Sequence, residues 1–493
     1  MNRDEMLARL ADRGARWDVL VIGGGATGLG AALDATTRGY RTLLVERGDF
    51  ACGTSSRSTK LIHGGVRYLR QGNIALVRES LRERELLLRN APDIVQPRTF
   101  IVPEYRWWET PYYALGLKIY GLLAQGSLPI PRHLNRAEIV NRLPGLNLCG
   151  LRGGELYHDA QFDDARLALR LAHTIAARGG TALNYVRVTA LNKRTNRVCG
   201  ARVLDLETNA EFAIEARAII NATGVFSDSV RRMDDCKAAP MLAPSQGAHI
   251  VLSAEFWPGD AALMVPRTDD GRVLFAIPWL GHVLVGTTDT AVNEIATEPR
   301  ALETEIDFLL KHAARYFVKT PRREDILSVF AGLRPLVKSP GNKATSKLAR
   351  DHVIEISPHG LLTITGGKWT TFRKMGEDAI DRAAEIGGLE RRACVTENLA
   401  LPAPPAFAGD SELLHARLPY RVADVQRAAR EEMARTVEDV LARRTRALFL
   451  DAKASIEIAP RVTALLAAEL NRDARWQQKQ IEDFCALARG YCA

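Results

Sequence analysis

The stretch Asp18-Val-Leu-Val-Ile-Gly-Gly-Gly-Ala-Thr-Gly28 lies near the start of the chain and decides its fold. An apolar run ends at Ile22, and the glycines that follow let the backbone turn tightly and approach a pyrophosphate. The chain then enters a predicted helix whose N-terminus would face phosphate charge. Gly23, Gly25 and Gly28 occupy the glycine positions of the dinucleotide-binding pattern, so we expect them to contact such a cofactor.

A carboxylate at the end of the next predicted strand completes this pattern. The segment 41–46 reads Arg-Thr-Leu-Leu-Val-Glu and ends in Glu46. A carboxylate at this place accepts hydrogen bonds from the ribose hydroxyls and would repel a 2′-phosphate. NADP is therefore disfavoured, while FAD and NAD both remain open on these residues alone.

Length and composition indicate a globular protein of several domains. The chain has 493 residues, of which 46% are hydrophobic and 25% charged, and it exceeds the size at which a single core stops growing. No apolar run reaches the length of about 20 residues that spans a bilayer. The first sixteen residues are rich in charge and lack the apolar core of a secretory signal. We therefore expect an intracellular protein without a transmembrane helix.

Charge and cysteines give weaker indications. The net charge of +9 is compatible with nucleic acid, anionic lipid or anionic substrates. Basic and acidic residues alternate in segments such as 430–435 and 438–443, which is typical of solvated helix faces and accounts for most of the excess. The seven cysteines form no CxxC pair and no regular framework. We expect reduced thiols and no metal site.

The order of predicted elements indicates a dinucleotide domain that is discontinuous in sequence. After the first βαβ unit come helical patterns over 76–88 and 156–178, an apolar strand closing at 218–224, and a strand, glycine turn and helix start over 360–371. Residues of about 240–340 alternate short β-like runs with turns, which predicts an inserted antiparallel sheet. A proline-rich linker at 401–405 precedes a helical remainder.

Several segments resemble the family of FAD-dependent glycerol-3-phosphate dehydrogenases. The most specific of them is Thr54-Ser-Ser-Arg-Ser-Thr-Lys-Leu-Ile-His-Gly-Gly-Val-Arg-Tyr-Leu69. The resemblance continues in the family's order through 221–224, 286–289, 332–335, 365–373 and 433–446, and so covers most of the chain. It implies that the cofactor is FAD and that glycerol 3-phosphate is oxidised to dihydroxyacetone phosphate, with electrons passed from the flavin to membrane quinone.

The order of the predicted elements gives the expected domains. We expect an α/β protein with a Rossmann-like FAD-binding domain, an inserted antiparallel-sheet substrate domain and a C-terminal helical domain. The FAD-binding domain would comprise 16–90, 150–240 and 345–395. The substrate and membrane-facing domain would comprise 91–149 and 241–344, and the helical domain 400–493.

Further cofactor contacts are expected from the same likeness. Backbone amides of the predicted glycine turn at 366–367, at a helix N-terminus, would stabilise negative charge on the reduced flavin. In addition to the first glycine turn and Glu46, the expected cofactor-binding residues are Thr54, Ser55, Ser58, Thr59, His63, Gly64, Gly65, Val188, Gly224, Gly366, Gly367 and Lys368.

The chemistry of a phosphorylated alcohol calls for cations and a base. Arginine matches phosphate oxygens with its planar fork, and lysine adds a point charge. The expected substrate-binding residues are Arg67, Tyr68, Thr287, Arg334, Arg350 and Lys368, although Arg350 next to Asp351 could equally form a surface ion pair. A base for the hydroxyl proton would most simply be a histidine. His249 and His63 are the candidates, with Arg334 as a further catalytic residue. Nothing beside Cys52 indicates an activated thiolate, so we expect it to serve packing.

An aromatic run over 105–126 suggests a surface for lipid. It holds several tryptophans and tyrosines with Lys118 inside it and Arg132 and Arg136 beyond, which suits a helix lying in the headgroup region. A helix buried under the substrate domain is the alternative. We expect a peripheral protein on the inner face of the cell membrane, in contact with anionic lipid, and a homodimer is conceivable.

Other functions stay open on the sequence. An oxidase of the same architecture would pass electrons to oxygen, and an FAD amine oxidase of the same superfamily would carry a carboxylate-binding pocket. An RNA-binding flavoprotein should show a basic stripe with exposed aromatics, but the aromatic run contains few cations. We therefore predict no nucleic-acid partner.

Overall fold

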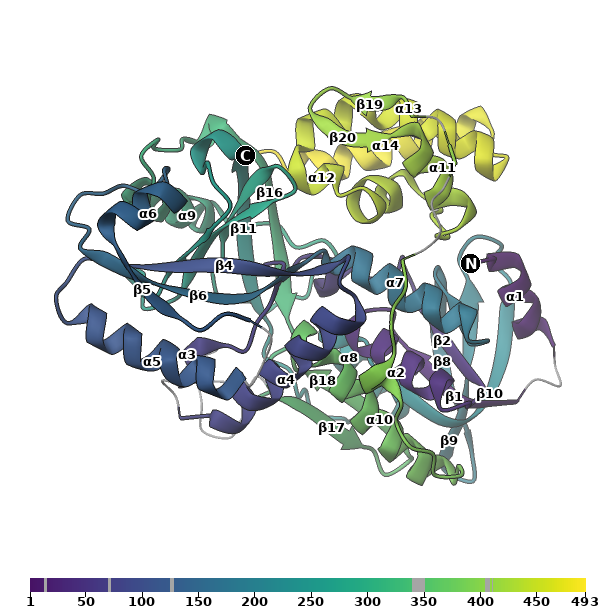
Figure 1. Ribbon diagram of the computed structural model, residues 1–493. Coiled ribbons are helices and arrows are strands. Elements are labelled where there is room, and N and C mark those ends of the chain that lie inside the picture. The colour runs from purple at the N-terminus through teal and green to yellow at the C-terminus, as the bar shows by residue number, and fades with distance from the viewer. Residues whose placement is uncertain (13–15, 70–71, 125–127, 339–350, 404–407, 410) are drawn as a thin grey trace.

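The computed structural model describes residues 1–493 except 13–15, 70–71, 125–127, 339–350, 404–407 and 410, and the side chains of 67 and 68 lie outside the description. Figure 1 shows two sheets beside each other and a mostly helical C-terminal region above them, drawn in yellow-green and yellow. The buried cores follow this division: one lies around the first sheet, others around the second, and one joins the second sheet to the C-terminal region.

The first sheet has the architecture of a dinucleotide-binding domain. Its order is β17-β18-β10-β1-β2-β7, with β8 and β9 continuing from β10. The strands from β18 to β7 run parallel, whereas β17, β8 and β9 pair antiparallel. The bounds are β1 (Arg16–Ile22), β2 (Thr42–Val45), β7 (Thr181–Leu183), β8 (Val186–Arg194), β9 (Arg197–Asp205), β10 (Glu211–Asn221), β17 (His352–Ile356) and β18 (Leu361–Gly366).

Strand register brings the expected turns to one edge of this sheet. Ile22 at the end of β1 pairs with Val45 of β2 on one side and Asn221 of β10 on the other. The apolar strand predicted at 218–224 is thus central in the sheet, as expected. Helices α2 (Ala26–Thr37), α7 (Asp164–Ala177) and α10 (Phe372–Gly387) pack around it. In open α/β sheets, ligands bind at the carboxyl ends of such strands.

The second sheet is mixed. Its order is β15-β11-β14-β13-β12-β4-β6-β3, with β16 paired to β11 and β5 paired to β6. All its pairs are antiparallel except that of β12 with β4, and the pairs among the strands of 245–334 are antiparallel, as predicted for about 240–340. The bounds are β3 (Leu61–Ile62), β4 (Val95–Glu104), β5 (Arg132–Asn135), β6 (Gly153–Phe162), β11 (Ser245–Ser253), β12 (Ala262–Val265), β13 (Leu274–Trp279), β14 (His282–Gly286), β15 (Thr290–Ala291) and β16 (Ile326–Arg334).

Two expectations about the chain between the sheets need correction. The helical pattern predicted over 156–178 begins only at Asp164, because 153–162 forms β6 and pairs with β4 along its whole length. Cross-strand pairing and burial here outweigh the local pattern. β3 and β6, both placed by the sequence in the dinucleotide domain, hydrogen-bond into the second sheet. The domain boundaries stay a prediction, with these two strands outside the first sheet.

The remaining helices cover the sheets or connect them. α4 contains the helical stretch predicted at 76–88, and α9 is a helix that the sequence analysis did not expect in the inserted domain. Their bounds, with those of the other helices outside the C-terminal region, are α1 (Arg3–Ala11), α3 (Val66–Leu69), α4 (Ile74–Asn90), α5 (Glu109–Ala124), α6 (Arg136–Arg142), α8 (Ser227–Asp234) and α9 (Glu303–Tyr316).

The C-terminal region is largely helical and binds both sheet domains. Arg443 Nε donates to Asp49 Oδ2 at 2.6 Å beside the first sheet, and Val329 N of β16 donates to the carbonyl oxygen of Tyr491 at 2.8 Å. A hairpin, which the helical prediction missed, precedes the helices. The elements are β19 (Leu413–His415), β20 (Leu418–Arg421), α11 (Val422–Arg430), a π-helical stretch Asp439–Arg444, α12 (Ala447–Leu450), α13 (Ala452–Leu470) and α14 (Ala474–Arg489).

Candidate active site

A cavity of about 440 Å³ is lined by residues of both sheets and by the segment 51–63 that links them. This volume lies in the range of small-molecule and cofactor sites. The structure brings to its wall most of the residues predicted for the site: Gly23, Gly25, Glu46, Thr54, Ser55, Ser58, Thr59, His63, Val188, Gly224, His249, Arg334, Gly366, Gly367 and Lys368.

One end of the cavity is formed by the first glycine turn. Gly23 has a φ of +113°, and a Cβ there would lie 2.6 Å from the carbonyl oxygen of Ala222. Gly25 is the N-cap residue of α2, and the next amide, that of Ala26, donates to Ser55 Oγ at 2.9 Å. The turn therefore brings backbone and a helix N-terminus to the cavity wall, as anion binding requires.

Glu46 lies directly after β2 at the same end. Its Oε2 accepts a hydrogen bond from Gly24 N at 2.7 Å, and its Oε1 accepts one from Gly48 N at 2.8 Å. Burial raises the pKa of this carboxyl group, and the two backbone hydrogen bonds oppose that effect. The carboxyl group thus lies against the glycine turn, where the dinucleotide pattern requires an acceptor for ribose hydroxyls.

The second glycine turn follows β18, as predicted. Gly366 and Gly367 have φ values of +81° and +68°, and a short 3-10 turn (Trp369–Thr371) leads from them into α10. Trp369 Nε1 donates to the carbonyl oxygen of Ser55 at 2.9 Å, which ties this turn to the segment beside the first one. The backbone of His63 exchanges hydrogen bonds with the hydroxyl of Thr370.

His249 enters the cavity from β11 of the second sheet. Its Nε2 lies 2.9 Å from Thr59 Oγ1, and its ring stacks on Phe330 with a centroid distance of 4.9 Å. Nδ1 is buried and has no hydrogen-bond partner in the part of the chain that the structure describes. Burial first, and then the charges of Lys60 and Arg334, lower the pKa of this imidazole well below its usual value. His249 is therefore neutral near pH 7.

A buried ionic cluster lies behind Thr59, and the sequence analysis missed it. Lys60 Nζ donates to Asp164 Oδ2 at 2.7 Å, and Arg446 Nη2 of the C-terminal region donates to Asp164 Oδ1 at 3.1 Å. Burial and the charge of Arg446 lower the pKa of Lys60 to about 7. Although burial acts the other way, the two cations lower the pKa of Asp164, which stays ionised. No local signal joins these three residues, because they meet only through the tertiary fold.

Arg334 and Lys368 supply positive charge to the cavity wall. The guanidinium of Arg334 donates from Nη2 to Thr287 Oγ1 and to the carbonyl oxygen of Thr288, each at 3.0 Å, and it lies 3.4 Å from Asp289 Oδ1. Lys368 Nζ donates to Ser80 Oγ at 3.1 Å. The Arg334 contacts fix its orientation, and Thr287 contributes to the site through Arg334.

Other predicted residues do not line the cavity. Gly28 permits close packing of α2 on the first turn, since a Cβ there would lie 1.8 Å from the carbonyl oxygen of Gly23. Gly64 packs against Leu81 and Tyr120, and Gly65, with a φ of +78°, precedes α3. Arg350 lies outside the described residues, as do the side chains of Arg67 and Tyr68.

The cysteines show no activated thiol. All seven are free, as the sequence predicted. Cys52 lines the cavity, but burial, followed by the charge of Glu46, raises the pKa of its thiol far above the usual range. A thiol that stays protonated is a poor nucleophile, which agrees with the packing role expected for it.

The residues present fit a flavin dinucleotide. The glycine turn, the α2 N-terminus and Glu46 form the recognised environment of a pyrophosphate and ribose. The second glycine turn, His249 and Arg334 line the same continuous cavity. The fold and the site thus define an oxidoreductase that uses a bound dinucleotide.

Comparisons with known proteins narrow this class. The model of the FAD dependent oxidoreductase family matches residues 18–373, and that of the C-terminal domain of alpha-glycerophosphate oxidase matches 394–479. A probable mitochondrial glycerol-3-phosphate dehydrogenase of Caenorhabditis elegans is 40% identical, over 97% of this chain and 74% of its own length. The mitochondrial glycerol-3-phosphate dehydrogenase of Homo sapiens is 39% identical over 95% and 72%, respectively.

Similar solved structures agree with these family and sequence matches. The glycerol-3-phosphate dehydrogenase of Bacillus halodurans in complex with FAD superposes with a TM-score of 0.80 at 28% identity, over 100% of this chain and 98% of that one. The L-alpha-glycerophosphate oxidase of Mycoplasma pneumoniae shares the fold, with a TM-score of 0.60 at 19% identity over 75% and 95%. The chain belongs to the FAD-dependent glycerol-3-phosphate dehydrogenase family, and its cofactor is FAD.

Proposed function

We propose that the protein oxidises sn-glycerol 3-phosphate to dihydroxyacetone phosphate and that the electrons pass to a membrane quinone. FAD, when bound, would supply the hydride acceptor at N5 of its flavin. The observation that carries the proposal is that one cavity is lined both by the two glycine turns and by His249, Arg334 and Lys368. A dinucleotide site and a cationic, histidine-bearing wall thus adjoin each other.

In this proposal the cations bind the phosphate. Arg334 is already oriented by Thr287, Thr288 and Asp289, so little side-chain freedom is lost when it binds substrate. Lys368, in the turn that follows β18 of the first sheet, adds a second charge. Arg67, Tyr68 and Arg350 stay predictions as further substrate contacts, and Thr287 would act by holding Arg334.

His249 would accept the proton of the reacting hydroxyl. Thr59 Oγ1 lies 2.9 Å from Nε2 and so fixes the orientation of the ring in the cavity wall. The buried imidazole is neutral near pH 7 and therefore in the state that a base requires. His63 stays the alternative base and, through its place beside Thr370, a predicted cofactor contact.

The cofactor contacts follow the two turns. Gly23, Gly25 and the α2 N-terminus would bind the pyrophosphate, and Glu46 the ribose. The amides around Gly366 and Gly367 would face the flavin. Thr54, Ser55, Ser58, Thr59, Val188 and Gly224 are proposed as the remaining contacts, while Gly28, Gly64 and Gly65 would shape the backbone around them.

The test is anaerobic bleaching of the purified yellow protein by glycerol 3-phosphate, followed at the flavin absorbance band. Sarcosine and unphosphorylated glycerol are the controls. Rapid bleaching by the phosphate ester alone supports the proposal. A flavin-loaded protein that the ester does not reduce would contradict it, and reduction by the amine would indicate an amine oxidase.

The electron acceptor needs its own measurement. After reduction by glycerol 3-phosphate, reoxidation is followed with a soluble ubiquinone analogue and, separately, with dissolved oxygen. Faster reoxidation by the quinone is expected. Reoxidation by oxygen with stoichiometric peroxide and none by quinone would instead identify an oxidase.

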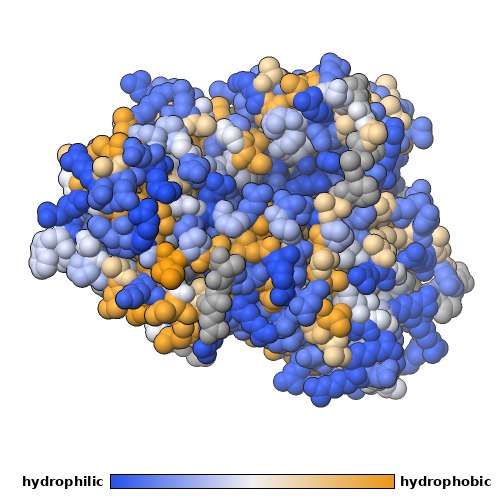
Figure 2. Space-filling model, viewed as in Figure 1, coloured by the Kyte–Doolittle hydropathy of each residue, from blue (hydrophilic) through white to orange (hydrophobic). Residues whose placement is uncertain are grey.

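We also propose that α5 binds the membrane surface. Its segment carries exposed Trp107, Tyr112, Leu115 and Leu122, with exposed fractions of 50–75%, and only Leu117 and Tyr120 of the helix are buried. Figure 2 shows hydrophobic residues gathered where α5 lies in Figure 1. Such a helix with neighbouring cations is typical of interfacial binding to anionic lipid.

The location of the protein is part of the same proposal. None of the helices in the described ranges is long and apolar enough to cross a bilayer. We place the protein on the inner face of the cell membrane. A homodimer stays a prediction.

A further inference from the structure

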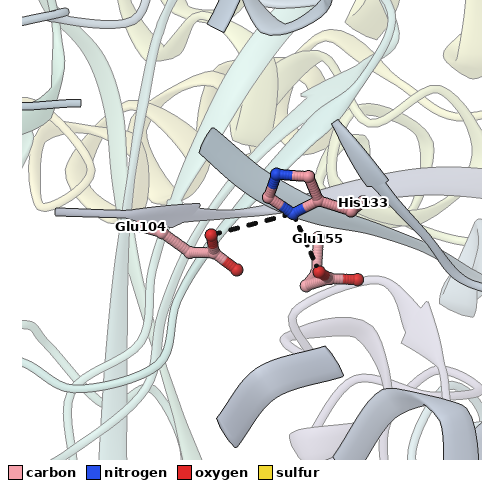
Figure 3. Close-up of side chains that lie close together, drawn as sticks. All are labelled: Glu104, His133 and Glu155. Carbon is pink, nitrogen blue, oxygen red and sulfur yellow. Dashed lines mark hydrogen bonds and ion pairs between the residues drawn. The ribbon is translucent and has the colours of Figure 1, made fainter. Parts of the chain in front are cut away.

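Two buried carboxylates and one histidine meet away from the cavity, on β4, β5 and β6 of the second sheet (Figure 3). His133 of β5 is paired directly with Glu155 of β6. Glu104 lies at the end of β4, two residues beyond Val102, which pairs with Glu155 from the other side. Strand register therefore places all three side chains on one face.

The distances suit a metal ion. His133 Nδ1 lies 3.1 Å from Glu155 Oε1 and 3.8 Å from Glu104 Oε2, and donor atoms of the three residues all lie within 4.8 Å of one another. Ligand atoms about 2.0–2.1 Å from a tetrahedral zinc ion are separated by about 3.4 Å. The observed nitrogen–oxygen distances bracket this value, so small side-chain rotations would bring the atoms into coordination.

An unpartnered acceptor points to a missing cation. Glu104 is completely buried, its Oε2 accepts a hydrogen bond from Thr110 Oγ1 at 2.6 Å, and its Oε1 is buried without a hydrogen-bond partner. Glu155 is only 3% exposed. Within the described part of the chain, neither carboxylate forms an ion pair with lysine or arginine. Two buried carboxylates that lie together without a lysine or arginine partner are costly unless another positive charge joins them.

A glycine in β6 makes room for the imidazole ring of His133. Gly153 of β6 lies under the ring, and a Cβ there would come within 2.8 Å of His133 Cε1 and 2.9 Å of its Nε2. Any side chain at this position would displace the histidine from the carboxylates. The side chain of His133 is 47% exposed, so the cluster is reached from solvent through this residue.

We propose that Glu104, His133 and Glu155 bind a divalent metal ion, and that the ion is zinc. One imidazole nitrogen and two carboxylates form a three-ligand set that zinc accepts, with water in the fourth position. The ion would join three strands and, through Thr110, the first turn of α5.

The donors explain why the sequence predicted no metal site. They come from three separate strands and include no cysteine, so no short motif such as CxxC marks them. Their neighbours in sequence are ordinary strand and loop residues. The cluster becomes visible only when β5 is placed beside β6.

Zinc binding to the chelator-treated, flavin-loaded protein is the test. Equilibrium dialysis with elemental analysis gives the stoichiometry, and calorimetry gives the affinity. We expect one zinc ion per chain that Glu104→Gln and His133→Ala each remove or weaken at least tenfold. Because the side chain of His133 is half-exposed, we expect His133→Ala to fold as the unaltered protein does. His282→Gln, at a histidine on β14 outside the cluster, should bind zinc as the unaltered protein does.

A second readout separates a bound ion from surface binding. Zinc at a hundred times its Kd should raise the unfolding temperature of the unaltered protein and of His282→Gln, but not of His133→Ala. Full zinc binding by both Glu104→Gln and His133→Ala would overturn the proposal. So would the lack of stoichiometric binding by the unaltered protein. Uptake of Mn²⁺ or Mg²⁺ in place of zinc would overturn the assignment of the metal.

Discussion

Thr59 Oγ1 lies 2.9 Å from Nε2 of His249, and this contact joins the segment after the first βαβ unit to strand β11 of the second sheet. The two residues are far apart in the sequence, and both line the cavity. Because Nε2 is engaged, the orientation of the ring is set before substrate arrives. The other nitrogen, Nδ1, is buried and has no hydrogen-bond partner among the residues that the structure describes.

Replacement of His249 should slow flavin reduction far more than it weakens substrate binding. General base catalysis contributes roughly 10²–10⁴-fold, so His249→Gln should lower the limiting rate of anaerobic reduction by about that factor. Thr59→Val, which removes only the Nε2 contact, should cost less. The flavin spectrum verifies that cofactor is bound. His282→Gln serves as control, and an unchanged rate in His249→Gln would move the base to another group such as His63.

The pH dependence of flavin reduction should follow the protonation of His249. Burial and two cations lower the pKa of His249, so the imidazole stays unprotonated until the pH lies well below 6.5. The reduction rate should therefore remain level from pH 8 to 6.5 and fall only at lower pH. Lys60→Met removes one of the cations and should move the fall toward higher pH. A midpoint at or above 6.5 in the unaltered protein would contradict this assignment.

Local motifs predicted the cofactor end of the site better than the substrate end. The turn after Ile22 and the carboxylate of Glu46 are specified by short-range chemistry that a single βαβ unit carries. In contrast, the partners of His249 and the contact between Lys60 and Asp164 depend on how β11, α7 and the C-terminal region pack together. The helix prediction is wrong over 156–162 for the same reason, because pairing of β6 with β4 decides the conformation there.

Arg334 should govern affinity for the phosphate group. Hydrogen bonds to charged groups contribute about 1.5–3 kcal/mol, so Arg334→Met should weaken glycerol 3-phosphate binding by roughly 10–100-fold. The concentration dependence of anaerobic flavin reduction measures this effect. Arg187→Met changes an exposed arginine that also lines the cavity and should leave the affinity unchanged. Equal losses in the two variants would indicate a general effect of charge.

Loss of the buried carboxylate of Asp164 should lower the free energy of unfolding more than loss of an exposed carboxylate. Asp164→Asn removes the counter-ion of the buried Lys60 and leaves Arg446 with the longer pair to Asp163 at 3.8 Å, which should lower the free energy of unfolding by about 3–5 kcal/mol. Glu385→Gln, which breaks an exposed pair with Arg382, should cost less than about 1 kcal/mol. Denaturant unfolding of both variants gives the comparison. Similar small losses would show that the cluster relaxes or admits water.

The exposed face of α5 should control lipid binding without affecting the chemistry. Trp107→Ser combined with Leu122→Ser removes two side chains that are 75% and 72% exposed. We expect less co-flotation with vesicles containing phosphatidylglycerol and an unchanged rate of flavin reduction. Val318→Ser, at a hydrophobic residue 65% exposed elsewhere, is the matched control. Full flotation of the double variant would place the lipid contact on another surface.

The contacts of Tyr491 have a consequence for synthesis of the protein. Its hydroxyl donates to Glu298 Oε1 at 2.6 Å, and both side chains contact Arg57, which lines the cavity. A growing polypeptide on the ribosome already contains both glycine turns and every proposed active-site residue long before residue 491 emerges. Until then, Arg57 lacks one of its partners and β16 lacks the backbone bond at Val329. Full assembly of this wall therefore waits for residue 491, and a chain stalled before that residue would carry an unfinished site.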